Sequence, residues 1–240
     1  MSRFLAHHIH SWEKDKTNIA HFFHEIVFHA IAAYLKDNSV IFVLDTALSE
    51  WESKFMHLLI KHLNIAHEYA TLHYDTNNAC LERNIQALPH FTEIMALIRK
   101  IVCDEFPDIT YTGNYKVLYL RDECPRRKML GYNGELNHYF DEVITDMSAL
   151  TFEQQVKLFM KCSHFITIEG AQLTNIIFMN KDATIYSIST TNNCWTLIFG
   201  TYKCIKNLEL IVLNYPDFND NITYTPVIKN IITKAIGVYL

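Results

Sequence analysis

Stretches with the apolar spacing of helices alternate, along the whole chain, with short apolar stretches typical of buried strands. The first helix pattern runs from Asn18 to Leu35, and the buried strand VIFVLD follows at 40–45. A second helix is expected at 50–63, a strand at 66–72 and a further helix at 92–106. Helices and strands in regular alternation favour an α/β fold with a mainly parallel sheet.

The segment PDITYTGN, at 107–114, is the strongest turn signal in the middle of the chain, because it combines proline, glycine and turn-forming polar residues. We therefore expect two domains, residues 1–112 and 113–240. The second restarts with the strand KVLYLR at 116–121. Its expected order is helix 151–161, strand 164–168, helix 172–179, strand 184–188, helix 194–202, strand 208–213 and helix 226–238. This order is typical of a doubly wound α/β domain, so two Rossmann-like halves would face each other across a cleft.

Composition limits the class of protein. Half of the 240 residues are apolar, with 15 Phe, 13 Tyr and little Gly or Pro, which is typical of a compact globular protein and excludes disordered and fibrous classes. The net charge of −5 gives no basic surface for nucleic acid or an anionic membrane. The six cysteines lie far apart without a CxxC pair, which favours reduced thiols over a zinc site or a disulfide framework.

No apolar run approaches the roughly 18 residues that span a bilayer, and the N-terminal residues lack the apolar core of a signal peptide. We expect no membrane segment in this chain and a cytoplasmic location, in the host-cell cytoplasm if the protein is viral. A chain from which an N-terminal anchor had been removed would have the same pattern.

The stretch TIEGAQLTN, at 167–175, joins an expected strand to an expected helix. Glu169, Gly170 and Ala171 place backbone amides at the start of that helix, where amides and the helix dipole favour a phosphate. Gly170 would let a ligand approach the backbone closely. The alternative is a tight connection in which Thr174 and Asn175 make only local hydrogen bonds.

Polar residues follow other expected strands at the same edge of the sheet. Arg121 ends KVLYLR, Arg126 and Arg127 come shortly after it, and Ser189 follows ATIYSI. Guanidinium groups bind phosphate oxygens in a bidentate fork, so converging arginines would neutralise a diphosphate. The alternative is a solvated face on which these arginines pair with neighbouring acidic residues.

The order of these features resembles the C-terminal half of glycosyltransferase family 61, which includes plant β-1,2-xylosyltransferase and the extracellular O-GlcNAc transferase. The resemblance rests on Arg121, Arg126-Arg127, Asn133-Gly134-Glu135, LTFEQQVKLF (150–159) and EGAQLTNIIF (169–178). NIAHFFHEIVFHAI, at 18–31, is similar to the early helix of the family, with Asn18 and His21 matching its "NxxH" start. Two departures stand out: Glu169 replaces the usual His before Gly-Ala, and the chain is shorter than typical members.

The resemblance implies a GT-B-like arrangement and inverting transfer of a sugar from a UDP-sugar to a hydroxyl of a glycan or glycoprotein, with xylose or N-acetylglucosamine favoured. Without an Asp-x-Asp motif, no metal or other cofactor is expected, and cationic side chains with helix amides would stabilise the leaving diphosphate. The expected donor-binding residues are Arg121, Arg126, Arg127, Asn133, Glu135, Glu169, Gly170, Ala171, Leu173, Thr174, Asn175 and Ser189.

Inversion requires a general base near the acceptor hydroxyl, and His21 and Asp45 are the candidates. Each has a structural alternative, since most of the 13 histidines must be structural and a strand-end Asp is often a helix cap. Glu169 would orient a ribose or sugar hydroxyl, or cap its own helix. Glu135 would hold the Arg121 loop by hydrogen bonds within the second domain, or contact the nucleotide.

A rival function is a non-catalytic glycan- or nucleotide-binding module with the same fold. The Glu169 departure and the short first half motivate it. A Rossmann dehydrogenase is disfavoured because no GxGxxG follows any expected strand. The HHIH stretch at 7–10 has no carboxylate or cysteine placed to complete a metal site.

Overall fold

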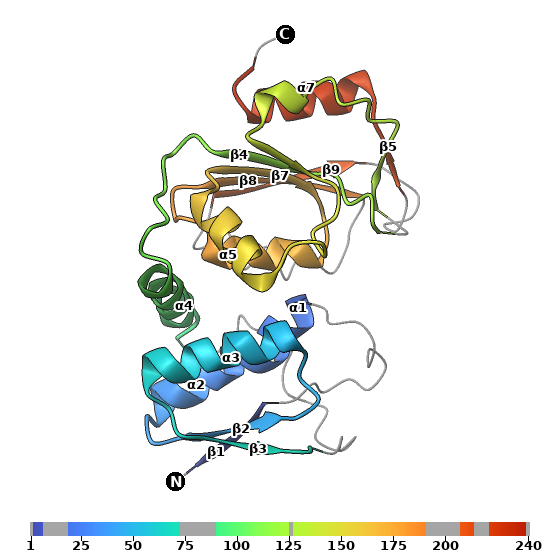
Figure 1. The fold of residues 1–240 in the computed structure, drawn as a ribbon. Coiled ribbons are helices and arrows are strands. Elements are labelled where there is room, and N and C mark those ends of the chain that lie inside the picture. Colours follow the sequence, from blue (N-terminus) through green and yellow to red (C-terminus); the bar gives the residue numbers. More distant parts are fainter. Residues whose placement is uncertain are drawn as a thin grey trace. The chain divides into compact units, whose positions relative to one another are not determined.

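The computed structural model describes residues 2–6, 19–72, 90–124, 127–190, 207–213 and 221–238, apart from the side chains of 21, 189, 190 and 207–213. The chain forms two compact units, Met1–Glu105 and Phe106–Leu240, in each of which helices accompany a parallel sheet (Figure 1). The expected α/β fold with parallel, Rossmann-like sheets is therefore confirmed. The units divide a few residues before the predicted boundary at 112/113, and the roles assigned to the two halves stay predictions.

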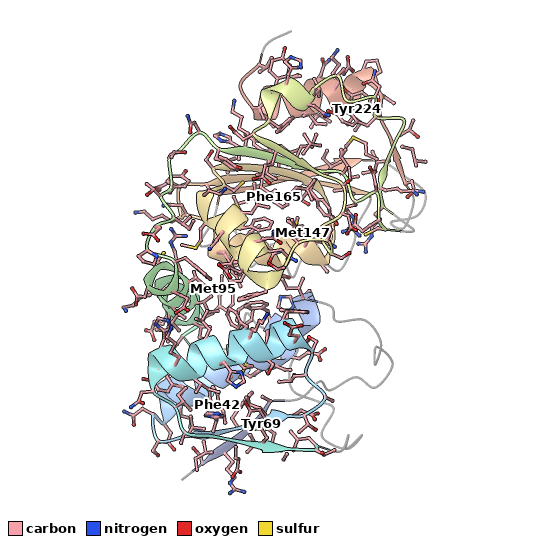
Figure 2. The ribbon with its side chains drawn as sticks, in the orientation of Figure 1. Phe42, Tyr69, Met95, Met147, Phe165 and Tyr224 are labelled. Atoms are coloured by element: carbon pink, nitrogen blue, oxygen red, sulfur yellow. The ribbon has the colours of Figure 1, made fainter. Side chains whose placement is uncertain are left out.

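The first unit is built on a three-stranded parallel sheet in the order β1-β2-β3. Its strands are β1 (Arg3–Ala6), β2 (Ile41–Asp45) and β3 (His67–Ala70). Helices α2 (Phe28–Lys36) and α3 (Glu50–Leu63) lie on one side of this sheet, and α4 (Phe91–Glu105) packs against both of them (Figure 1). Phe42, labelled in Figure 2, is fully buried in the resulting core.

The first helical region covers nearly the expected residues but is not one regular helix. It consists of α1 (Ile19–His21), the π-helical turn η2 (Phe22–Val27) and α2. All six side chains of η2 are buried. Phe22 packs edge-on to Trp51 with ring centroids 4.9 Å apart, and Phe23 packs on Phe55 at 4.9 Å. The wider π turn fits these rings into the core, a tertiary requirement that apolar spacing along the chain does not record.

The second unit contains a five-stranded parallel sheet in the order β6-β4-β7-β8-β9. The strands are β4 (Lys116–Tyr119), β6 (Glu142–Ile144), β7 (His164–Ile168), β8 (Thr184–Thr190) and β9 (Asn207–Leu213). After β6 the chain crosses back over β4 to begin β7, so the direction in which strands are added reverses between β4 and β7. This is the flavodoxin-like strand order, and the reversal is its topological switch point.

Helices cover both faces of this sheet. On one face lie α5 (Phe152–Lys161) and the 3-10 helix η6 (Ala171–Phe178), and on the other lies α7 (Pro226–Ala235), as Figure 1 shows. Phe159 of α5 packs on Phe165 of β7 with ring centroids 4.9 Å apart (Figure 2). The opposite core joins strand residues such as Ile166 to Ile228 and Ile232 of α7.

A smaller sheet extends the α7 face. In it, β5 (Met129–Leu130) pairs in parallel with β10 (Ile222–Thr223), and the short 3-10 helix η5 (Asn137–Tyr139) follows β5 in the chain. Met129, Leu136 and Ile222 belong to the same buried cluster as α7. Met129 and Leu136, which lie between β4 and β6 in the chain, therefore pack on the α7 face.

The predicted helix 50–63 coincides with α3, because a complete capping box between Ser49 and Glu52 marks its start. The predicted helix 194–202 lies outside the described residues. β1, β5, β6 and β10 were not predicted; each has two to four residues, so its own alternation of apolar and polar positions is a weak signal. Among the described helices, none combines the length and apolarity needed to cross a bilayer.

Candidate functional site

Two of the predicted site segments in the second unit, Arg121 and the Glu169-Gly170 turn, lie where β4 and β7 end, at the switch point of the sheet. Arg121 lies two residues beyond β4, and Glu169 and Gly170 come directly after β7. Tyr119 of β4 pairs with Thr167 of β7, so the two strand ends are adjacent. Open parallel sheets bind ligands outside the carboxyl ends of the strands at such a point. The topology thus joins Arg121 to the Gly170 turn, as expected from the sequence.

The guanidinium of Arg121 is held by two hydrogen bonds. Its Nε donates to the carbonyl oxygen of Arg127 at 3.1 Å, and its Nη1 donates to Oε1 of Gln172 at 2.6 Å. The residue is only 4% exposed. A cation held in this fixed geometry would meet an anionic ligand without further ordering, and the donor-binding role of Arg121 stays a prediction.

Gly170 is the surface on which this guanidinium rests. A Cβ atom at position 170 would lie 1.4 Å from Nη1 and 2.5 Å from Cζ of Arg121. The backbone of Gly170 is extended, with φ 176°, so any residue could adopt its conformation. The glycine is therefore needed for the close approach of Arg121. The space over Gly170 that was expected to admit a ligand is taken by this side chain.

The loop between Arg121 and Arg127 is strained at both ends. Arg121 has φ 60° and Arg127 has φ 55°, in the left-handed region that costs a non-glycine residue about 1–2 kcal/mol. The amide of Cys124 donates to the Arg121 carbonyl at 3.0 Å and closes a turn over residues 121–124. Arg127 is 8% exposed, so the solvated-face alternative does not hold for these two arginines. Arg126 lies outside the described residues.

The helix that follows Gly170 begins without a side-chain cap. No side chain caps η6 at Gly170, and the first internal bond runs from the Leu173 amide to the Gly170 carbonyl at 3.0 Å. The first amides of a helix have no partners within it and favour negative charge. Leu173 is fully buried and packs in the core, while Ala171 is half-buried.

Three buried oxygens of η6 and β8 have no hydrogen-bond partner among the described residues. They are Thr174 Oγ1, Asn175 Oδ1 and Ser187 Oγ. Ser187 of β8 pairs with Thr167 of β7, the strand that Glu169 follows. Leaving such a group unpaired costs about 1–3 kcal/mol, so each of these oxygens calls for an explanation such as a bound ligand. Sequence reasoning missed Ser187, whose signal is a small polar residue within the apolar stretch ATIYSI.

Two further side chains border the Arg121 loop. The hydroxyl of Tyr119 donates a short hydrogen bond to Glu123, and burial together with this carboxylate raises the pKa of the phenol. Burial also raises the pKa of the Cys124 thiol. Both groups are therefore protonated near neutral pH, and Arg121 remains the cationic group that β4 brings to the switch point.

Comparison with known families adds to this geometry. The sequence profile of Glycosyltransferase 61 matches residues 19–186, which is most of the chain. The chain belongs to glycosyltransferase family 61. Membership implies an enzyme that transfers a sugar from a donor to an acceptor. A search of curated proteins found no significant match.

In the family-like motif Asn133-Gly134-Glu135, Asn133 bonds within the motif and Glu135 bonds residues near β10 and α7. The Oδ1 of Asn133 accepts from the Glu135 amide at 3.1 Å. The carboxylate of Glu135 accepts from the Lys229 ammonium at 2.7 Å and from the Tyr224 hydroxyl at 2.8 Å, and both bonds lower its pKa. These contacts lie on the α7 side, whereas η6 covers the other face. A donor-binding role for Asn133 and Glu135 stays a prediction.

The two proposed bases of this family 61 protein lie in the first unit. Asp45 ends β2, and its Oδ1 accepts from the Ala47 amide at 3.0 Å. The cap of α3 is Ser49, so Asp45 is not the helix cap that the alternative supposed. The backbone of His21 ends α1, and its side chain lies outside the described part. Their catalytic role stays a prediction.

The remaining sequence candidates are placed only in part. Glu169 is 1% exposed and its amide donates to the Ile188 carbonyl at 2.9 Å, so its backbone is tied to β8, and its role in the site stays a prediction. Ser189 lies in β8, but its side chain is outside the described part. HHIH at 7–10 lies outside the described residues, and within the described ones no three His, Cys, Asp or Glu side chains cluster as a metal site would require.

Proposed function

We propose that this protein is an inverting glycosyltransferase that moves a sugar from a UDP-sugar to a hydroxyl of a glycan or glycoprotein. The observation that carries the proposal is the buried Arg121 guanidinium, fixed on Gly170 at the switch point of a doubly wound sheet. Family membership supplies the reaction class, and this geometry supports an anionic donor.

The diphosphate of the donor would lie at the start of η6. A guanidinium has five N–H donors, and two of those of Arg121 are engaged with Arg127 and Gln172. The remaining N–H groups of Arg121, together with Arg127 and the uncapped amides of η6, would donate hydrogen bonds to the phosphate oxygens. Charge-assisted hydrogen bonds of this kind stabilise the negative charge that develops on the leaving diphosphate without requiring a metal ion.

The acceptor would bind the first unit, with the two units forming the lobes of a GT-B-like enzyme. Asp45 stands at the carboxyl end of β2, where a parallel sheet presents functional groups. Asp45 or His21 would remove the proton from the attacking hydroxyl, which inversion in a single displacement requires. Xylose or N-acetylglucosamine is the proposed sugar, by analogy with family members.

Isothermal titration calorimetry with UDP, UDP-xylose and UDP-N-acetylglucosamine, each in the presence of a chelator, tests the donor site. We expect binding by the wild-type protein and binding at least tenfold weaker in Arg121→Lys, because an ammonium cannot reproduce the guanidinium fork. Failure of all three nucleotides to bind the folded protein would refute the proposal.

A second candidate function is a nucleotide- or glycan-binding module without turnover, and Glu169 favours it. This buried carboxylate stands where the family usually has His. Donor hydrolysis and transfer are to be measured for the wild type, Arg121→Ala and Asp45→Asn. If the wild type binds UDP yet its turnover equals that of both variants at the buffer background, the binding module is the function. Glu169→His then tests whether turnover returns.

A further inference from the structure

The amide of Gln155, on α5, is fixed by backbone on one side. Its Nε2 donates to the carbonyl oxygens of Met147 at 3.1 Å and Leu150 at 3.0 Å. Figure 2 labels Met147, which is buried in the segment preceding α5. Carbonyl oxygens only accept hydrogen bonds, so an amide nitrogen, with both of its hydrogens, must occupy this position. The Oε1 atom of Gln155 must therefore point the other way.

That oxygen dictates the orientation of a second amide. The Nδ2 of Asn175, on η6, donates to Gln155 Oε1 at 3.3 Å. A flipped Asn175 would set its Oδ1 against Gln155 Oε1, and two acceptors facing each other repel. The two amides thus form a chain with one allowed polarity, in which Asn175 turns an acceptor oxygen away from α5.

The oriented oxygen is the one that has no partner within the described part of the chain. Asn175 is 1% exposed and its Oδ1 is buried. Asn175 also follows Gln172 by three residues in a 3-10 helix, where side chains three apart eclipse, and Gln172 holds Arg121. The same row of η6 therefore carries the residue that orients the guanidinium and the residue that presents an acceptor.

We propose that Gln155 is a positioning residue of the donor site: it orients Asn175 so that Oδ1 accepts a hydrogen bond from a hydroxyl or N–H group of the bound UDP-sugar. This inference rests on the proposed function, since it supposes that the donor binds at the Gly170 turn. An acceptor in this place selects ligand groups that carry a hydrogen, which both a sugar and a uracil ring supply.

Near-isosteric substitutions separate positioning from simple stabilisation. Gln155→Met removes the amide and frees Asn175 to flip, and Asn175→Leu removes the acceptor. We expect each to weaken binding of UDP-sugar on the order of fivefold, the size of one hydrogen bond. Because Gln155 acts through Asn175, the double variant should bind as weakly as Asn175→Leu alone. Gln154→Met is the matched control: its side chain only caps α5, through the Thr151 amide at 2.8 Å, so it should lower stability without changing affinity.

Affinities for UDP, UDP-xylose and UDP-N-acetylglucosamine are measured by calorimetry on variants that circular dichroism shows to be folded. If the wild type binds and Arg121→Lys does not, but Gln155→Met binds like the wild type, the positioning role alone is wrong. The positioning role is also wrong if the losses in the double variant multiply, or if Gln154→Met weakens binding equally. If the wild type binds none of the three probes, the proposed function fails together with this inference.

Discussion

Replacing Gly170 with Ala tests whether the guanidinium of Arg121 is the reason for glycine at the switch point. The added Cβ would lie 1.4 Å from Nη1 and 2.5 Å from Cζ, so the guanidinium must leave its position. The extended backbone adds no strain of its own. The cost is therefore that of the two hydrogen bonds that Arg121 makes to Arg127 and Gln172.

Hydrogen bonds from a charged donor contribute about 1.5–3 kcal/mol each, so loss of both lowers the free energy of unfolding by about 3 kcal/mol or more. In an Arg121→Ala background the obstacle is gone, and the nearest remaining atom to the new Cβ is Gln172 Oε1 at 3.0 Å, at the end of a flexible side chain. Gly170→Ala should there cost under about 1 kcal/mol. The two substitutions are thus expected to be strongly non-additive.

Urea unfolding followed by circular dichroism, on the wild type, both single variants and the double variant, measures this coupling. UDP titration of the same proteins should show that Gly170→Ala weakens binding about as much as Arg121→Ala. Gly113→Ala is the control, because no atom would lie within 4 Å of the Cβ that alanine adds, and only the φ of 79° at this position is unfavourable. Additivity of the two substitutions within about 0.5 kcal/mol would show that the Arg121 contact is not what requires glycine.

Three further results are expected. Burial, and to a lesser degree the charge of Lys116, lower the pKa of His164, so the folded state disfavours the protonated imidazole. Stability should therefore fall as the pH drops below about 6.5. His164→Gln should flatten the dependence of Tm on pH between about 7 and 5, and an unchanged slope would contradict this. Ser49→Ala removes the capping box of α3 and should cost about 1 kcal/mol in urea unfolding, whereas equal stability would mean that the cap contributes nothing. Glu135→Gln breaks a partly exposed ion pair with Lys229, which should change stability little; UDP affinity that falls about tenfold in calorimetry would support the predicted donor-binding role of Glu135, and unchanged affinity would contradict it.

Several parts of the fold could be predicted because their signals are local. Apolar spacing and a capping box fix α3 within a single stretch of sequence, and the same holds for the strand-to-helix change around Gly170. The order of Arg121, the 150–159 helix and the Gly170 turn also indicated the family, which the match over residues 19–186 confirmed.

Other features depend on contacts between distant residues. The aromatic side chains of the π turn at Phe22–Val27 pack against aromatic rings of α3. Glu135 accepts hydrogen bonds from Tyr224 and Lys229, about ninety residues later in the chain. Neither partner is visible in the apolar pattern of the segment itself. The sequence could therefore name Glu135 as a candidate, but could not say which groups its oxygens meet.

The sequence by itself determined most of the longer helices and the strands that precede the site, because backbone propensity, apolar period and capping act over a few residues. Only the tertiary structure decided that β7 adds next to β4, because strand order depends on how crossovers pack on the two faces of a sheet. That order brings Arg121 onto Gly170, so the space above this glycine, which was expected to admit a ligand, is occupied by a guanidinium. The contact joins residues 49 positions apart in the sequence. No local pattern encodes it, because the two residues meet only after both strands have taken their places at the same edge of the sheet.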